Sequence, residues 1–296
     1  MKQSIICLVC TLWLSTTVSG QRFDDVKITT HKINDELHIL FGAGGNILTL
    51  TGPEGTLMVD TQFAPLSEKI TAAINEIDSG AIKYVINTHF HGDHTGGNEA
   101  FATKGATIIA HDNVRTRLST DQIRPYGRSV DAAPPGAWPR LTFNDEMQIH
   151  MNGHLIQLIH VHTGAHTDSD ALVYLPMANV LHMGDIFFKD RFPFIDSDLG
   201  GDPDGMIATV EAALMLCDAD TQIVPGHGAI SDKEDLSRYL QMLKIMVDRV
   251  KAEVAAGSGI LTLDMDKLVE GYSSWGDGFM KSDTFVKILF RKYSEE

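Results

Sequence analysis

Three histidines and one aspartate lie within six residues of this chain, at His89, His91, Asp93 and His94. The apolar stretch 82–86 comes just before them and has the composition of a buried strand. On an extended segment, the side chains of His89 and His91 point to the same side, so they can hold one ion together. Imidazole and carboxylate groups are ligands that zinc and similar cations prefer. The spacing therefore predicts a metal site at the end of a strand.

Further histidines and aspartates stand before and after this pattern. Asp60 ends an apolar run, His166 lies two residues after a glycine, and Asp185 and His227 each lie beside a glycine. The run from Asn87 to Asn98 resembles the His-x-His-x-Asp-His signature of the metallo-β-lactamase superfamily. The other four positions resemble the remaining motifs of that family, in the family's order. The chain is therefore identified as a member of this superfamily by resemblance.

The resemblance implies two zinc ions per chain. The first ion would be bound by His89, His91 and His166, and the second by Asp93, His94 and His227. Asp185 would lie between the ions, and Asp93 would also be catalytic, by orienting a shared metal-bound hydroxide or accepting a proton. Asp60 would steady the metal loop without binding metal. The alternative for Asp60 is a strand-end aspartate that caps local backbone.

Strand and helix patterns alternate in two similar halves, with no linker between them. In the first half, strands are predicted near 26–30, 37–41, 47–50, 56–59, 82–86 and 106–110, with a helix over 67–77. In the second half, strands are predicted near 155–161, 171–175, 179–182 and 222–224, with helices over 203–217, capped by Asp202, and from a capping box at 231–234 to about 256. The resemblance implies an α/β fold, the four-layer αβ/βα sandwich of the metallo-β-lactamase type, with the site along one edge.

The first twenty residues have the pattern of a secretory signal peptide. Lys2 supplies a positive start, 5–14 is a short apolar core, and Val18-Ser19-Gly20 offers a cleavage site. The apolar core is too short to span a bilayer, so no membrane anchor is expected. We therefore expect residues 21–296 to form a single exported domain, periplasmic or secreted.

Composition restricts the partners of this domain. Removal of the first twenty residues leaves Cys217 as the one cysteine, so no disulfide can form within the mature chain and a buried thiol is expected. The formal charge of −15 becomes −16, because Lys2 is the one charged residue that is removed. A surface this acidic argues against nucleic acid, because phosphates require a basic footprint. We expect a small-molecule substrate, and the sequence leaves the oligomeric state open.

The aspartate at position 185 separates two branches of the superfamily that the chain resembles. The best-known zinc β-lactamases with three histidines at the first metal have a cysteine there, whereas glyoxalase-II-like thioesterases have an aspartate. The surrounding segments 170–176 and 184–189 look closer to the lactamase branch. In that branch a nearby lysine binds a substrate carboxylate, which points to Lys189 or Arg191 here. A solvated loop cation is the alternative for each of them.

Two loops are candidates for covering a substrate. The glycine-rich loop 41–46 stands where true lactamases have a mobile hairpin, and its shortness implies an open cleft. The segment 124–140, with Tyr126 and Trp138, is either an alternative lid or a surface excursion.

The leading hypothesis is an exported dinuclear zinc hydrolase that cleaves a β-lactam. A thioester or lactone hydrolase of the glyoxalase-II-like type is the alternative that Asp185 favours. An iron-dependent redox relative is less consistent with the sequence, because such members usually replace a ligand and carry a flavin domain. A non-enzymatic binding protein is also disfavoured, because the ligand set is intact.

Overall fold

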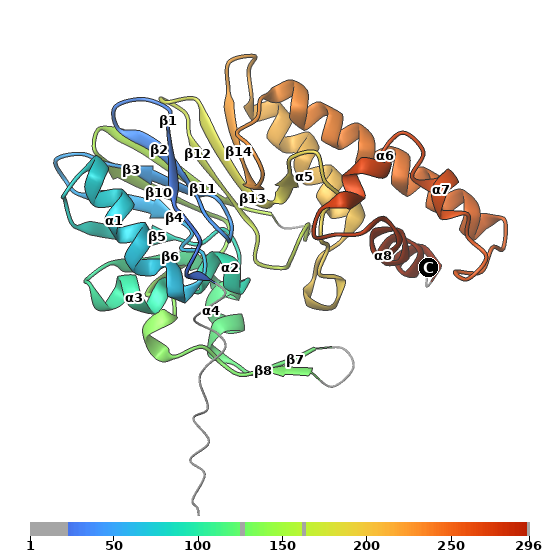
Figure 1. The fold of residues 1–296 in the computed structure, drawn as a ribbon, viewed down its shortest axis with the longest axis horizontal. Helices are drawn as coiled ribbons and strands as arrows, with labels where there is room; N and C mark the ends of the chain where they lie inside the picture. Colours follow the sequence, from blue (N-terminus) through green and yellow to red (C-terminus); the bar gives the residue numbers. More distant parts are fainter. Residues whose placement is uncertain (1–22, 125–127, 162–163, 295–296) are drawn as a thin grey trace, which may run out of the picture.

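The computed structural model describes residues 23–124, 128–161 and 164–294. Two β-sheets lie face to face at the centre of these residues, and helices cover the outer face of each sheet (Figure 1). The expected four-layer αβ/βα sandwich is confirmed. The expected signal peptide and Tyr126 lie outside the described residues.

The first sheet has seven strands in the order β1-β2-β3-β4-β5-β6-β9. They are β1 (Thr29–Lys32), β2 (Leu37–Phe41), β3 (Ile47–Leu50), β4 (Thr56–Val59), β5 (Ile82–Ile86), β6 (Thr107–His111) and β9 (Leu141–Phe143). β1 to β4 pair antiparallel, whereas β4, β5, β6 and β9 pair parallel. The connections between the parallel strands contain α1 (Ser67–Ile77), α2 (Gly92–Thr95), α3 (Asn98–Thr103) and α4 (Asp112–Ser119).

The second sheet has five strands in the order β10-β11-β12-β13-β14. They are β10 (Glu146–Met151), β11 (His154–His160), β12 (Ala171–Leu175), β13 (Val180–Phe188) and β14 (Gln222–His227). β10 to β13 pair antiparallel, and β13 pairs parallel with β14 through the crossover helix α5 (Pro203–Leu216). The chain ends in α6 (Lys233–Ala255), α7 (Met265–Leu268) and α8 (Ser282–Ser294). A separate hairpin of β7 (Gln122–Arg124) and β8 (Arg128–Val130) projects from the body (Figure 1).

Strands that are covered on both faces explain the apolar runs of the first half. Leu37 and Ile39 of β2 belong to the core between the two sheets, whereas Leu40 packs in the core under α1. Leu57 and Met58 of β4 divide between the same two cores. Because successive side chains of a strand point to opposite faces, burial on both sides requires an apolar residue at nearly every position.

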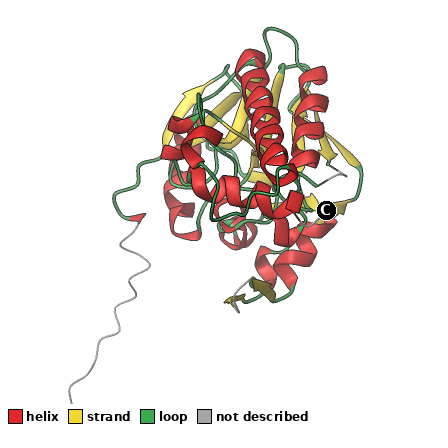
Figure 2. Cartoon of the chain, turned by 90° about the vertical axis from the view of Figure 1, so that its right-hand side faces the viewer, coloured by secondary structure: helices red, strands yellow, loops and turns green. Residues whose placement is uncertain are grey.

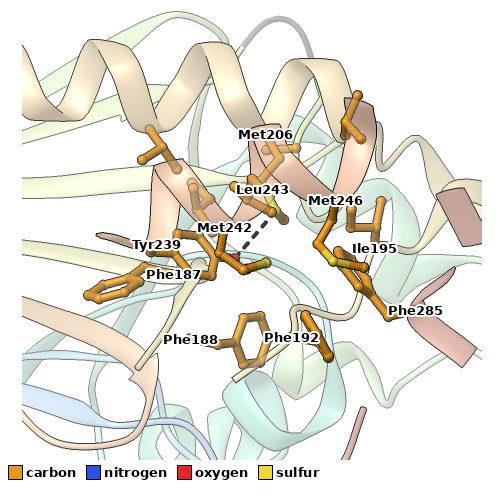
Figure 3. Packing of buried hydrophobic residues seen from close by; sticks show 14 of the residues in the cluster. Phe187, Phe188, Phe192, Ile195, Met206, Tyr239, Met242, Leu243, Met246 and Phe285 are labelled. Atoms are coloured by element: carbon orange, nitrogen blue, oxygen red, sulfur yellow. Dashed lines mark hydrogen bonds between the residues drawn. The ribbon is translucent and has the colours of Figure 1, made fainter. Parts of the chain in front are cut away.

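The helices of the second half cover the other sheet, as seen when the molecule is viewed from the right-hand side of Figure 1 (Figure 2). Tyr239, Met242, Leu243 and Met246 of α6 form a buried stripe at helical spacing. The Tyr239 ring lies 5.1 Å from that of Phe187 in β13, and the Tyr239 hydroxyl donates to a methionine sulfur at 3.5 Å (Figure 3). This core fixes β13, which contributes to the site described below.

Some predicted boundaries were wrong. The first strand starts at Thr29 rather than 26. β13 continues beyond the predicted 179–182 as far as Phe188, because its pairing with β14 resumes across register shifts around Gly184. Gly184 and Asp185 thus lie inside the strand, at an irregularity of the pairing. The N-cap of α6 is Asp232, which accepts a hydrogen bond from the backbone of Asp235, rather than Ser231.

Two other expectations, the cap of α5 and the buried thiol, are confirmed. Asp202 caps α5 by accepting hydrogen bonds from two backbone amides. Cys217 follows α5 and is buried. Among the described residues, no helix combines the length and the apolar composition needed to cross a bilayer.

Candidate functional site

Hydrogen bonds join the two ends of the loop that carries the histidine cluster. Asn87 and Asn98 are fully buried and exchange side-chain hydrogen bonds of 3.1 and 2.8 Å. Thr61, just after β4, donates to the carbonyl oxygen of His94 at 3.0 Å. β5 therefore ends in a rigid turn, and the short helix α2 then redirects the chain so that Asp93 and His94 leave the strand direction.

The structure brings the seven predicted ligand residues together in two groups. The first group is His89, His91, His166 and Asp185, and the second group is Asp93, His94 and His227. Within each group, one ligand atom from every residue lies within 4.8 Å of the others. They come from the turn after β5, from α2, from the interior of β13, from the end of β14 and from the loop before β12. The grouping has the same division into two sites that the resemblance implies.

Asp185 faces both groups with different oxygen atoms. Its Oδ1 lies 3.1 Å from His94 Nε2 and 3.4 Å from His227 Nε2. Its Oδ2 lies 3.6 Å from His166 Nε2 and 3.9 Å from His89 Nε2. A carboxylate in this position can share its two oxygens between two ions. Asp185 would therefore be a ligand for metal at both groups if each of them held an ion.

Asp60 supports the second group from behind. The backbone nitrogen and the hydroxyl of Thr88 donate to its two carboxylate oxygens, at 2.9 and 2.8 Å. His94 Nδ1 lies 2.7 Å from Asp60 Oδ2, which leaves the Nε2 atom of the ring for the centre of the site. Asp60 is fully buried and has a φ of 64°. Carboxylates that orient a ligating imidazole in this way fix its tautomer and raise its basicity.

A segment that the sequence analysis did not single out supports the first group. His91 Nε2 lies 2.9 Å from Asp196 Oδ2, and His91 Nδ1 lies 2.8 Å from His166 Nε2. The carbonyl oxygen of Phe194 lies 2.7 Å from His166 Nδ1. One nitrogen of each ring is thus held from outside and the other faces the centre. No local motif marks Asp196, because its role depends on the loop after β13 reaching a histidine 105 residues earlier.

Asp196→Asn is expected to weaken zinc binding by the first group by about 10-fold, because outer carboxylates of this kind typically contribute 10- to 100-fold in metal affinity. Asparagine keeps the size of the side chain but lacks the negative charge that stabilises the imidazole. Competition with a chromogenic chelator measures the effect. Asp198→Asn is the matched control, since Asp198 lies 3.4 Å from Arg291 instead. Equal zinc affinity in both variants would refute a role for Asp196.

The loop that carries His166 is held by another buried carboxylate, Asp170. The backbone nitrogens of His166 and Thr167 donate to its Oδ2 at 2.7 and 2.8 Å, and the Thr167 hydroxyl donates to its Oδ1 at 2.6 Å. Burial raises the pKa of Asp170 to about 7, although these donors oppose the shift. Asp170 therefore fixes the backbone that presents His166.

The two groups differ in their electrostatics. Burial, followed by the nearby His91, lowers the pKa of His166 to about 4, and burial also lowers that of His89. For His227, burial opposes charging, but Asp185 and Asp93 raise its pKa to about 9. The pKa of His94 is also raised, because Asp185, Asp60 and Asp93 together outweigh its burial. The second group therefore attracts cations strongly, and a divalent ion there competes with protons on its imidazoles.

The donor set fits a metal. His89 Nε2 is buried at the centre of the first group and has no hydrogen-bond partner among the described residues. An unpaired polar atom in such a position is costly unless something binds it. Neutral imidazoles with carboxylates are suitable ligands for zinc. Zinc would thus satisfy atoms that the protein leaves without partners.

The glycine-rich loop 41–46 is tied to the site. An added Cβ on Gly45 would lie 2.1 Å from the His94 ring. Any residue larger than glycine at this position would therefore push the loop away from His94. The backbone nitrogen of Gly45 donates to the carbonyl oxygen of Asp93 at 3.0 Å. The Asn46 side chain donates to the carbonyl oxygens of Pro225 and Gly228, at 2.8 and 2.9 Å. These bonds make the loop a fixed rim rather than a flap.

The cavity at the site has a volume of about 500 Å³ and is lined by two members of each ligand group, His91 and Asp185 of the first and Asp93 and His227 of the second, together with phenylalanine side chains. Arg191 lines this cavity. Lys189 forms an ion pair with Asp235 instead, and it is absent from the described lining. None of the described residues in 128–140 lines the cavity either; Ala137 and its neighbours line a second hollow that shares His91. Of the two predicted cations, Arg191 is the one placed to meet a substrate.

A fold of two sheets between helical layers, with histidines and aspartates gathered at one edge, is the arrangement of a metal-dependent hydrolase. The sequence pattern of the metallo-beta-lactamase superfamily matches residues 41–227, more than half of the chain. The chain belongs to this superfamily.

Several relatives are similar to this chain. A hydroxyacylglutathione hydrolase of Nitrosococcus oceani is 30% identical over 171 residues, which are 57% of each protein. A type 2 metallo-beta-lactamase of Bacillus cereus is 25% identical over 207 residues, which are 67% of this chain and 73% of that protein. Among solved structures, a metallo-beta-lactamase from Pontibacter korlensis superposes with a TM-score of 0.61 at 19% identity, over 74% of this chain and 99% of its own. This structural likeness supports the fold.

Proposed function

We propose that this chain is a dinuclear zinc hydrolase that cleaves thioesters or lactones. The observation that carries the proposal is the position of Asp185, whose two oxygens face the two ligand groups. No thiolate takes part in either group within the described residues, because Cys217 follows α5 and lies outside both. Similarity to a hydroxyacylglutathione hydrolase also supports thioester or lactone hydrolysis. This similarity favours the alternative named from the sequence over β-lactam hydrolysis.

The roles of the residues follow from their geometry. Zinc bound by the two groups would polarise the substrate carbonyl and lower the pKa of a water molecule. Asp93 lines the cavity, and its Oδ2 lies 3.2 Å from His227 Nε2. Burial alone would raise the pKa of Asp93, but His94 and His227 lower it to about 2, so the carboxylate is ionised at neutral pH. It can therefore orient a water molecule by accepting a hydrogen bond from it.

A substrate panel tests the proposal. Zinc-loaded protein is assayed with an acyl-thioester, a lactone, a chromogenic cephalosporin and a phosphodiester. We expect kcat/KM for the thioester or the lactone to exceed that for the cephalosporin by at least about 10-fold, a difference of about 1.4 kcal/mol in barrier. A higher kcat/KM for the cephalosporin would contradict the proposal and support the second candidate, β-lactam hydrolysis, which the similarity to the Bacillus cereus enzyme favours.

Export is part of the proposal, because residues 1–20 have the pattern of a signal peptide. Sequencing the N-terminus of the protein from the host's extracytoplasmic fractions checks it, with a start at Gln21 expected. A chain that keeps Lys2 and stays inside the cell would contradict export without affecting the hydrolase proposal.

A further inference from the structure

Aromatic side chains continue outward from the metal ligands along one wall of the cavity. The ring of Phe194 stacks on His91 with centroids 5.8 Å apart, and Phe279 meets Phe194 edge-on at 6.4 Å. The ring of Phe188, which also lines the cavity, stacks on His227 at 5.5 Å. Both ligand groups therefore border on apolar surface.

The outer part of this wall comes from residues 256–294, which follow α6 and are called the C-terminal segment below. Phe279 and Met280, which lie between the turn 273–277 and α8, line the cavity beside the metal ligands. The segment is fastened to the loop after β13, because Phe192 donates its backbone N–H to Trp275 at 3.1 Å and stacks on Phe285 at 4.7 Å. Figure 3 shows Phe192 and Phe285 in the same buried cluster. The position of Phe279 is thus built into the fold.

The exposure of Phe279 points to a ligand. Its side chain is 86% exposed, whereas the neighbouring Met280 is buried. A large aromatic residue that projects into a cavity gains free energy when an apolar group covers it. Apart from the ligand side chains and Arg191, the described residues that line the cavity carry no charge. A highly polar group would therefore find few partners along this wall.

We propose that Phe194, Phe279 and Met280 form an acyl-binding subsite, and that the substrate carries an apolar medium-chain or aryl acyl group. This inference rests on the proposed thioester or lactone hydrolysis and specifies its substrate class. The carbonyl group lies at the two ligand groups, and the acyl chain extends over Phe194 toward Phe279. The C-terminal segment thereby determines specificity, although it contributes no metal ligand.

The test uses a series of acyl-thioesters of one small neutral thiol, N-acetylcysteamine, carrying acetyl, butanoyl, hexanoyl or phenylacetyl groups. With zinc-loaded protein, kcat/KM is expected to rise about fourfold per added methylene of the straight acyl chains, as for burial of a methylene group. In Phe279→Ala the ratio of kcat/KM between hexanoyl and acetyl substrates is expected to fall about 10-fold. Phe279→Leu should restore most of that ratio.

Leu261→Ala is the matched control, because Leu261 is also an exposed apolar residue of the C-terminal segment, at 96%, and does not line the cavity. In Leu261→Ala, the ratio of kcat/KM between the hexanoyl and acetyl substrates should equal that of the unmutated protein. Thioester hydrolysis with a flat acyl series, or the same ratio in Phe279→Ala, would overturn the subsite while leaving the proposed function standing.

A binding measurement separates the two proposals if no thioester is cleaved. Hexanoate and acetate are titrated into zinc-loaded protein by calorimetry, so that the carboxylate is common and the chain differs. Tighter binding of hexanoate that is lost in Phe279→Ala supports the subsite even when the proposed reaction fails. Equal binding of the two carboxylates overturns the subsite.

Discussion

Asp185→Asn is expected to lower kcat by about 100- to 1,000-fold, which corresponds to about 3–4 kcal/mol of barrier. The two oxygens of Asp185 face different ligand groups, 3.1 Å from His94 and 3.6 Å from His166. Asparagine has nearly the same shape but one neutral oxygen, so it cannot bridge two cations. The second ion should be lost first, because Asp185 lies closer to that group: its Oδ1 is 3.1 and 3.4 Å from His94 and His227, whereas its Oδ2 is 3.6 and 3.9 Å from His166 and His89.

The measurements are kcat with the best substrate of the panel and the zinc content after dialysis. Asp220→Asn is the matched control, because it makes the same change of charge at an exposed position outside both groups. If Asp185→Asn retains both its zinc and its rate, Asp185 is a structural carboxylate and the bridging role is wrong.

Removal of metal is expected to abolish hydrolysis and to lower the melting temperature by about 20 °C. Each ion adds stability that depends on its concentration relative to Kd, about 4 kcal/mol at 1,000-fold excess. For a domain of this size, 1 kcal/mol corresponds to a shift of about 2–4 °C. Buried ligand atoms such as His89 Nε2 have no partner among the described residues to compensate for the loss.

The experiment compares chelator-treated protein with protein dialysed without chelator, by calorimetry and elemental analysis. Activity should return as zinc is added back, and the return should be complete at two equivalents per chain. One tightly held ion with no second at saturating zinc would contradict the dinuclear site. Full activity in verified metal-free protein would contradict a metal-dependent reaction altogether.

The sequence by itself determined the elements whose signals are local. β2, β3, β4, β5, β12 and α1 have the predicted bounds. Apolar runs and polar turns are read over a few residues, so these segments could be predicted without knowledge of their neighbours. The ligand set could be predicted for a similar reason, since four of its members occupy six consecutive residues. The other three stand in short motifs whose order matches the family.

Tertiary structure alone decided which residues surround those ligands. Asp196 reaches His91, and Phe279 approaches the cavity, from segments that carry no motif. Lys189 and Arg191 are two residues apart, yet one pairs with Asp235 on α6 and the other lines the cavity. Strand pairing and helix packing bring these groups within a few ångströms, and such contacts depend on the whole chain. A metal ligand can be recognised by its chemical type, whereas a supporting or substrate-binding residue is defined by its position in space.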